Sequence, residues 1–126
     1  MDTGDLDRIS YLIIESAIEI HKTLGPGLLE SVYETCLAFE LSKRGLRVRR
    51  QVAVPFMYDG VMLGAELRID LLVEEQVIIE VKAVEKLIPV FEAQLLTYLK
   101  LANKRLGFLI NFNVEVIKNG LKRRIL

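Results

Sequence analysis

The chain has 126 residues, of which 52% are hydrophobic and 27% are charged, and its 17 basic and 17 acidic side chains give a net charge of zero. This composition predicts one folded domain over 1–126 and excludes a disordered chain, and no apolar run reaches the ~20 residues that span a bilayer. Because His21 and Cys36 are the only histidine and cysteine, an internal disulfide, an ordinary zinc site and a Ser-His-Asp triad are excluded.

Two helices are predicted first along the chain. A period of 3.6 residues over about 6–23 gives one apolar stripe, formed by Ile13, Ala17, Ile20 and Leu24 and widened by Ile14 and Ile18. The run Gly25-Pro26-Gly27 ends this helix. A second helix is expected over about 28–44, with Gly45 after its end. One face of this helix carries Val32, Cys36 and Phe39, with Tyr33, Leu37 and Glu40 beside it.

From Leu46 the apolar period changes to two, which predicts strands over about 47–58, 61–73 and 77–83, the first two joined by a hairpin turn at Asp59-Gly60. Pro89 then opens a helix over about 89–103. Its apolar stripe is formed by Phe91, Leu95, Tyr98 and Ala102.

A buried strand is expected at 106–111, and Asn119-Gly120 indicates a last hairpin turn before a closing strand at 121–125. The order α-α-β-β-β-α-β predicts an α/β fold in which helices flank a mixed sheet. The strand at 106–111 follows a helical crossover, so we expect it to lie parallel to one of the earlier strands.

The pairing of the second and third strands decides where their charges lie. One face of the third strand carries Val77, Ile79 and Val81, and its other face carries Ile78, Glu80 and Lys82. One face of the second strand carries Ile69, Leu71 and Val73, and its other face carries Arg68, Asp70 and Leu72. A two-residue loop would pair Leu71 with Glu80 and bury a charge. A three-residue loop at 74–76 pairs Val73 with Val77 and Asp70 with Glu80, and burial favours it. That loop has no glycine, so turn chemistry does not support it.

In the favoured register two carboxylates face each other across the ladder, which is destabilising without a compensating cation. Mg²⁺ accepts oxygen ligands from one or two carboxylates, water and a substrate phosphate. Lys82 points the same way as Glu80, so it could hold an attacking water or stabilise charge on a phosphate. This set suits metal-assisted phosphodiester hydrolysis, and the alternative is a cross-strand salt bridge.

Further polar residues lie on the predicted helices. Glu30 shares a face with Tyr33 and Glu34, although an acidic residue near a helix N-terminus is also favoured by the helix dipole. Gln94 and Tyr98 share a face at a spacing of four residues, and the alternative is a polar residue beside a core tyrosine. At the end of the first helix, His21 fits a role at the C-terminal dipole better than one in catalysis.

Several ordered motifs resemble one family. Gly27-Leu28-Leu29-Glu30-Ser31-Val32-Tyr33 matches the pattern that names the GxxExxY protein family, within a similar run that starts at His21. The segments Asp70-Leu71-Leu72-Val73, Glu80-Val81-Lys82-Ala83, Gln94-Leu95-Leu96-Thr97-Tyr98-Leu99 and Gly107-Phe108-Leu109-Ile110-Asn111-Phe112 are also similar to it, so the resemblance extends roughly from His21 to Arg124. That family is placed in the PD-(D/E)xK nuclease superfamily, although Ile69 stands where the superfamily's name has proline.

The resemblance implies a restriction-endonuclease-like core of α-β-β-β-α-β order and a nuclease that uses Mg²⁺ or Mn²⁺. Asp70 and Glu80 would bind the metal, with the backbone carbonyl of Val81 as a further ligand, and Lys82 would be the catalytic lysine. Glu30 resembles the additional helical acid of several branches. Gln94 and Tyr98 match a QxxxY element that helps to hold the site and the substrate strand.

The charge distribution bears on partners. The net charge of zero is unfavourable for a nucleic-acid binder, which is usually basic. Two clusters could still contact phosphates: Lys43, Arg44, Arg47, Arg49 and Arg50, and then Lys118, Lys122, Arg123 and Arg124. There is no Trp, and few aromatic residues fall among these charges, so base stacking is not indicated. The lone cysteine and the acidic N-terminal segment, which lacks a signal-peptide pattern, predict a cytoplasmic protein.

Three functional hypotheses follow. The first is a metal-dependent nuclease that acts on DNA or RNA. A non-catalytic nucleic-acid or protein binding module on a nuclease-like fold is the second. In the third, the chain is a structural homo-oligomer that pairs through exposed apolar edge strands near the C-terminus.

Overall fold

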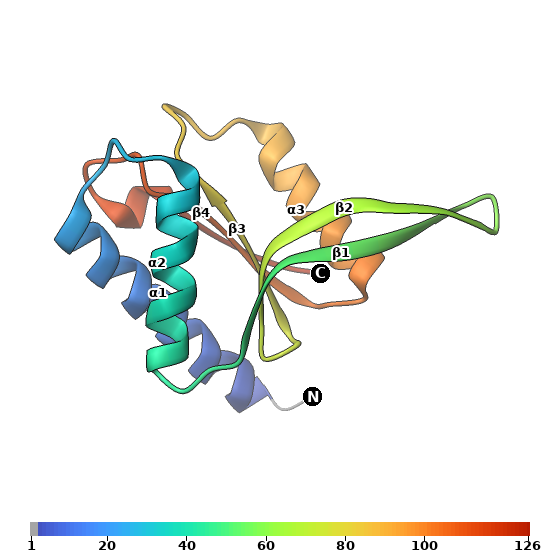
Figure 1. The fold of residues 1–126 in the computed structure, drawn as a ribbon, viewed down its shortest axis with the longest axis horizontal. Helices are drawn as coiled ribbons and strands as arrows, with labels where there is room; N and C mark the ends of the chain where they lie inside the picture. The colour runs from blue at the N-terminus through green and yellow to red at the C-terminus, as the bar shows by residue number, and fades with distance from the viewer. Residues whose placement is uncertain (1–2) are drawn as a thin grey trace.

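The computed structural model describes residues 3–126 as three long helices around one five-stranded sheet (Figure 1). The elements in chain order are α1 (Thr3–Leu24), α2 (Glu30–Lys43), β1 (Val48–Tyr58), β2 (Val61–Val73), β3 (Val77–Lys82), α3 (Pro89–Ala102), β4 (Leu106–Asn111), the 3-10 helix η1 (Ile117–Gly120) and β5 (Leu121–Ile125). In residues 3–126 no helix has both the length and the apolar character needed to cross a membrane.

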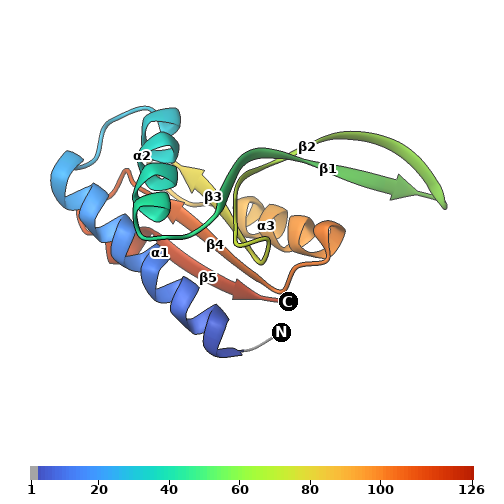
Figure 2. The same ribbon diagram turned by 60° about the horizontal axis from the view of Figure 1, so that its bottom comes forward.

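The sheet has the order β1-β2-β3-β4-β5, and helices cover both of its faces. Figures 1 and 2 show α1 and α2 together on one side and α3 on the other. Neighbouring strands are antiparallel except β3 and β4, which are parallel and joined through α3. The predicted mixed α/β fold and the parallel strand after the helical crossover are therefore confirmed.

Each helix buries one stripe of its surface. On α1 the buried stripe includes Ile13, Ala17 and Ile20, as predicted, whereas Ile18 and Leu24 at its margins are exposed. On α2 the buried face carries Tyr33, Leu37 and Leu41, and Phe39 is exposed. These residues form one core with the near face of the sheet, and α3 forms a second core on the far face through residues that include Leu95 and Leu99.

The turn between β2 and β3 has the three residues that burial predicted. Val73 pairs with Val77 and Leu71 pairs with Ile79, which confirms this register. The turn forms without glycine because Glu74 and Glu75 adopt left-handed backbones, with φ of 54° and 55°. That conformation costs a residue with a side chain about 1–2 kcal/mol. Core packing has therefore overridden local turn preference.

Strands β1 and β2 rotate about their axes at one position. Val48 and Leu71 pack into the core under α1 and α2, whereas Val52 and Ile69 pack into the core under α3. Alternation along a regular strand would keep Ile69 on the face of Leu71 and Val73, so that sequence prediction is wrong. The rotation occurs where Gln51 lies between the pairs Arg50–Leu71 and Val52–Ile69, and the φ of Gln51 is 50°.

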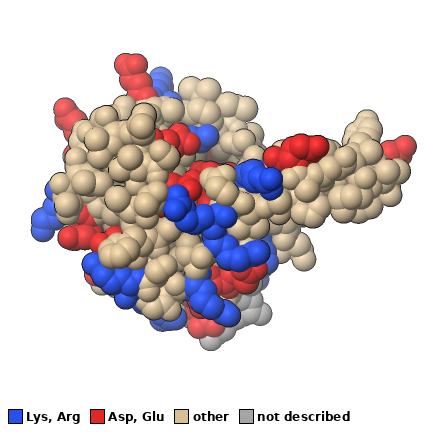
Figure 3. Space-filling model, viewed as in Figure 1, with Lys and Arg blue, Asp and Glu red and all other residues tan. Residues whose placement is uncertain are grey.

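Beyond this rotation β1 and β2 project from the domain as residues 56–63, which we call the arm (Figures 1 and 2). The predicted hairpin turn is present, since Asp59 and Gly60 have φ of 54° and 75° and Tyr58 pairs with Val61. The arm's large apolar side chains are more than half exposed at five positions: Met57, Tyr58, Val61, Met62 and Leu63. Figure 3 shows it as an almost uncharged extension of a body on which both charges are mixed.

The pair Asn119-Gly120 does not form the expected hairpin turn. Both residues belong to η1, and β4 reaches its antiparallel partner β5 through residues 112–120. A Cβ atom on Gly120 would lie 2.0 Å from the backbone oxygen of Asn111. Glycine is therefore required here because two backbones approach closely, and not because a left-handed turn is needed.

Candidate active site

The β2–β3 ladder ends at the pair Leu71–Ile79, and Asp70 and Glu80 come next. Their side chains make the following contacts instead of another ladder pair. The backbone N–H of Asp70 donates to Oε2 of Glu80 at 3.2 Å, and the backbone N–H of Val81 donates to Oδ2 of Asp70 at 2.8 Å. The two carboxyl groups predicted to face each other are thus brought together where the strands separate.

Burial and charge repulsion act together on Glu80, which is only 5% exposed. Desolvation, followed by the charge of Asp70, raises the pKa of the Glu80 carboxyl to about 9. A side-chain hydrogen bond with Asp70 contributes to this increase, whereas the hydrogen bond from the Asp70 backbone N–H and the charge of Lys82 act in the opposite direction. At neutral pH the pair therefore retains one proton, which a cation would have to displace.

Lys82 lies on the α3 side of the sheet. Its Nζ atom is 4.5 Å from the centroid of the Phe91 ring, a cation–π distance. A groove of about 520 Å³ opens beside it, lined by residues that include Lys82, Phe91, Gln94 and Tyr98. The lysine is therefore held at the wall of an open groove rather than paired with a surface carboxylate.

Gln94 and Tyr98 contact each other, since Nε2 of Gln94 donates to the Tyr98 hydroxyl at 3.2 Å. Desolvation and then the charge of Glu80 raise the pKa of Tyr98, and the hydrogen bond from Gln94 opposes this. Tyr98 therefore lies within electrostatic range of the carboxylate pair, and its contact with Gln94 agrees with the helix face that the sequence predicted the two residues share.

Glu30 is the first residue of α2. Its pKa is raised, mainly by desolvation; Lys82 lowers it and Asp70 raises it. The Glu30 carboxyl therefore lies within electrostatic range of Asp70 and Lys82.

Tyr33 organises the loop that precedes Glu30. Its hydroxyl donates to the Gly25 carbonyl at 2.6 Å and accepts from the Leu28 N–H at 3.1 Å. The ring stacks on Phe112 with centroids 4.6 Å apart. In this chain the tyrosine of the Gly27–Tyr33 motif is thus a buried anchor, and it fixes the start of α2 where Glu30 lies.

His21 is separate from this group. Its Nε2 lies 2.6 Å from the carbonyl oxygen of Val114, so the ring ties the end of α1 to the segment before η1. This contact is structural, and His21 also lies in the last turn of α1, where the sequence favoured a role at the helix dipole.

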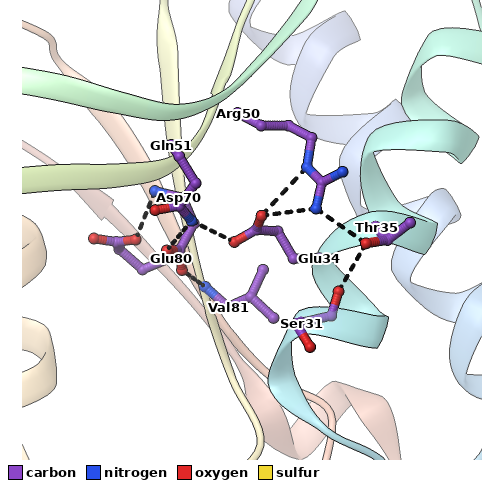
Figure 4. A network of polar contacts seen from close by, with 8 residues as sticks. All are labelled: Ser31, Glu34, Thr35, Arg50, Gln51, Asp70, Glu80 and Val81. Atoms are coloured by element: carbon purple, nitrogen blue, oxygen red, sulfur yellow. Dashed lines mark hydrogen bonds and ion pairs between the residues drawn. The ribbon is translucent and has the colours of Figure 1, made fainter.

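Sequence reasoning missed three residues that border the site: Glu34, Arg50 and Gln51. Figure 4 shows them in one network with Asp70. Glu34 is 8% exposed and accepts from Gln51 at 2.8 Å and from Nη2 of Arg50 at 3.0 Å. Only Glu34 had a signal in the sequence, because it lies on the helix face of Glu30.

Asn111 is a further polar residue that sequence reasoning left without a role. It is buried and lies beside Lys82 in the β3–β4 ladder. Its side chain accepts from the Val84 N–H at 3.0 Å and donates to the Val84 carbonyl at 2.9 Å. Asn111 therefore fixes the chain just after Lys82.

Each cation of the first basic cluster pairs with a glutamate of the domain, and two of them share one glutamate. Lys43 and Arg44 pair with Glu40, and Arg47, Arg49 and Arg50 pair with Glu74, Glu75 and Glu34. In the second cluster Arg124 pairs with Glu92. Such pairs leave less free positive charge for phosphates than the sequence suggested.

The donor set limits which metal fits. Within residues 3–126 no group of three or more His, Cys, Asp or Glu side chains converges as a metal site. Two adjacent carboxylates beside an open groove suit Mg²⁺ or Mn²⁺, which retain water and substrate oxygens as further ligands, better than a cation caged by protein alone.

Comparison with known proteins agrees with this geometry. A family model described as the PD-(D/E)XK nuclease superfamily matches residues 7–124. No curated protein and no solved structure matches the chain. The observed three helices and mixed five-stranded sheet are consistent with the restriction-endonuclease-like fold of that superfamily.

Proposed function

Because the chain belongs to the PD-(D/E)XK nuclease superfamily, we propose that it is a Mg²⁺- or Mn²⁺-dependent nuclease that hydrolyses phosphodiester bonds of DNA, or of RNA. The observation that carries this proposal is the contact between Asp70 and Glu80 at the end of the β2–β3 ladder. Two carboxylates in contact, of which Glu80 is buried, are unfavourable unless a proton or a cation compensates them. Lys82 follows Glu80 by two residues on the same strand.

In this proposal Asp70, Glu80 and the carbonyl of Val81 hold the divalent ion, which supplies Lewis-acid stabilisation of the phosphate and a more acidic water. Lys82 orients the attacking water or stabilises the negative charge that develops on the phosphate. Glu30, the first residue of α2, is the additional acidic residue of the catalytic site. Gln94 and Tyr98, hydrogen-bonded to each other, position the substrate strand in the groove.

The alternative function is a non-catalytic module that binds nucleic acid or protein. It is favoured by one observation: every cation of the 43–50 cluster is paired with a glutamate. Two further assignments extend the proposal. The protein acts in the cytoplasm, and it forms a homo-oligomer through β5, an edge strand on which Ile125 is exposed.

The testing experiment is a calorimetric titration of Mg²⁺ and Mn²⁺ into the wild type and an Asp70→Asn/Glu80→Gln double variant. A matched double variant, Asp59→Asn/Glu75→Gln, removes two exposed carboxylates far from the pair. All three proteins are then incubated with supercoiled, linear and single-stranded DNA and with RNA.

Saturable binding and cleavage that only the site variant loses would support the nuclease. Binding without cleavage of any substrate would favour the binding module. If the site variant binds ions as well as the wild type does, the carboxylate pair is not a metal site.

A further inference from the structure

Gln51 joins two carboxylates that belong to different layers of the domain. Its Nε2 atom donates to Oε1 of Glu34 on α2 at 2.8 Å and to Oδ1 of Asp70 on β2 at 3.3 Å (Figure 4). We propose that Gln51 is a positioning residue that fixes the Asp70 carboxylate for metal binding. Its relevance to catalysis rests on the nuclease function proposed above.

The contacts of Asp70 leave its side chain little freedom. Oδ1 accepts from Gln51 and Oδ2 accepts from the Val81 N–H. Removing the Gln51 amide would leave the carboxylate held from one side only. A carboxylate that ligates a metal needs such partners, because they set its orientation.

The other end of Gln51 is itself anchored. Glu34 is almost fully buried, and its second oxygen accepts from Arg50, which also donates to the Thr35 hydroxyl at 3.0 Å. Arg50 balances the charge of Glu34. The Gln51 amide therefore donates to a carboxylate that is held in place by an ion pair, and not to a mobile surface side chain.

The backbone of Gln51 gives an independent observation. Its φ of 50° is in the left-handed region, which glutamine rarely adopts. Glycine would be the residue of choice if only the strand rotation mattered. A strained residue with a specific side-chain task is characteristic of functional sites.

Gln51→Gly separates the two roles, because it relieves the backbone and removes the amide. Asn103→Gly is the matched control, since Asn103 also has a left-handed φ, 56°, at the end of α3 away from the site. Gln51→Leu removes the amide at similar side-chain length and keeps the strain. The readouts are the melting temperature, Mn²⁺ affinity by calorimetry, and hydrogen exchange of the Val81 amide by NMR without metal.

We expect both Gln51 variants to bind Mn²⁺ about 10–100-fold more weakly than the wild type, the usual effect of removing a partner of a metal ligand. Their Val81 amide should exchange at least about fivefold faster, the factor that corresponds to one hydrogen bond of ~1 kcal/mol. Gln51→Gly should show both effects although it melts no lower than Gln51→Leu, and Asn103→Gly should show neither.

An unchanged Val81 amide in Gln51→Gly would overturn the proposal, and so would Mn²⁺ affinity equal to that of the wild type. A wild type that binds no Mn²⁺ would refute the metal-dependent nuclease instead. In that case the Val81 amide alone decides whether Gln51 fixes Asp70.

Discussion

Replacing Glu80 by glutamine should stabilise the metal-free domain, and more so as the pH rises. Glu80 is buried, and its pKa is raised from 4.5 to about 9, so the native state keeps a proton that the unfolded chain loses above pH 4.5. Stability therefore falls by about 1.4 kcal/mol for each pH unit between these two values. At pH 7 the loss relative to pH 4.5 is about 3 kcal/mol, and it stops growing above pH 9.

Glutamine has nearly the same shape as a protonated glutamate and does not titrate. Glu80→Gln should thus match the wild type near pH 4.5 and exceed its free energy of unfolding by about 3 kcal/mol at pH 7. Urea unfolding at pH 5, 6, 7 and 8 in the presence of a chelator measures this difference. The control is Glu75→Gln, which replaces an exposed carboxylate outside the buried pair and should not reproduce the gain of Glu80→Gln at pH 7.

Parallel pH profiles for the wild type and Glu80→Gln would refute the reasoning, because they would mean that Glu80 is ionised in the native domain. Added Mg²⁺ gives a second check. An ion that displaces the proton should restore wild-type stability at high pH by preferential binding to the native state, and the variant should gain less.

Three further predictions concern other parts of the molecule. Lys82→Met should lower the rate of cleavage in a plasmid-nicking assay by at least about 10²-fold and retain the affinity for the ion. Lys86→Met, in the following loop, should leave cleavage unchanged, and equal effects of the two variants would argue against a role for Lys82 at the phosphate. Tyr33→Phe keeps the stack on Phe112 and loses the hydroxyl that ties Gly25 to Leu28, so urea unfolding should show a loss of about 1–3 kcal/mol; no loss would show that the loop is held by other contacts. Glu75→Gly relieves the strain of a left-handed backbone, about 1–2 kcal/mol, but it loses an exposed ion pair with Arg49 that contributes up to about 1 kcal/mol. The melting temperature of this variant should therefore rise slightly, and a clear fall would mean that the backbone strain at Glu75 is small.

Much of the fold could be predicted because burial leaves few choices for these strands. The β2–β3 register follows from keeping Glu80 off the face of Val77 and Ile79, even though the turn has no glycine. The hairpin at Asp59-Gly60 and the parallel β4 follow from local turn chemistry and from the length of the crossover.

The errors arise where tertiary contacts decide the local structure. Ile69 changes faces because β1 and β2 rotate together at Gln51 and Asp70, and alternation within one strand carries no sign of this. Gly120 resembles a turn residue, yet it is required by the approach of the Asn111 backbone from another element.

The candidate site was predictable in part for the same reasons. Asp70, Glu80 and Lys82 lie on two strands joined by a short turn, so one register argument relates all three. Gln51 lies opposite Asp70 in the pairing of β1 with β2, whereas Glu34 contacts Gln51 from α2. The contact of Glu34 depends on how α2 packs over the sheet. No spacing in the sequence encodes that packing.

Strands β1 and β2 differ in local stability along their length, because the arm at their tip lies outside the body of the domain. Around the turn, residues of β1 and β2 pair only with each other, and an isolated hairpin is marginally stable. Nearer the body, the same strands carry Gln51 and Asp70 between two helical layers. Local opening of the tip therefore needs far less free energy than global unfolding and leaves the carboxylates in place.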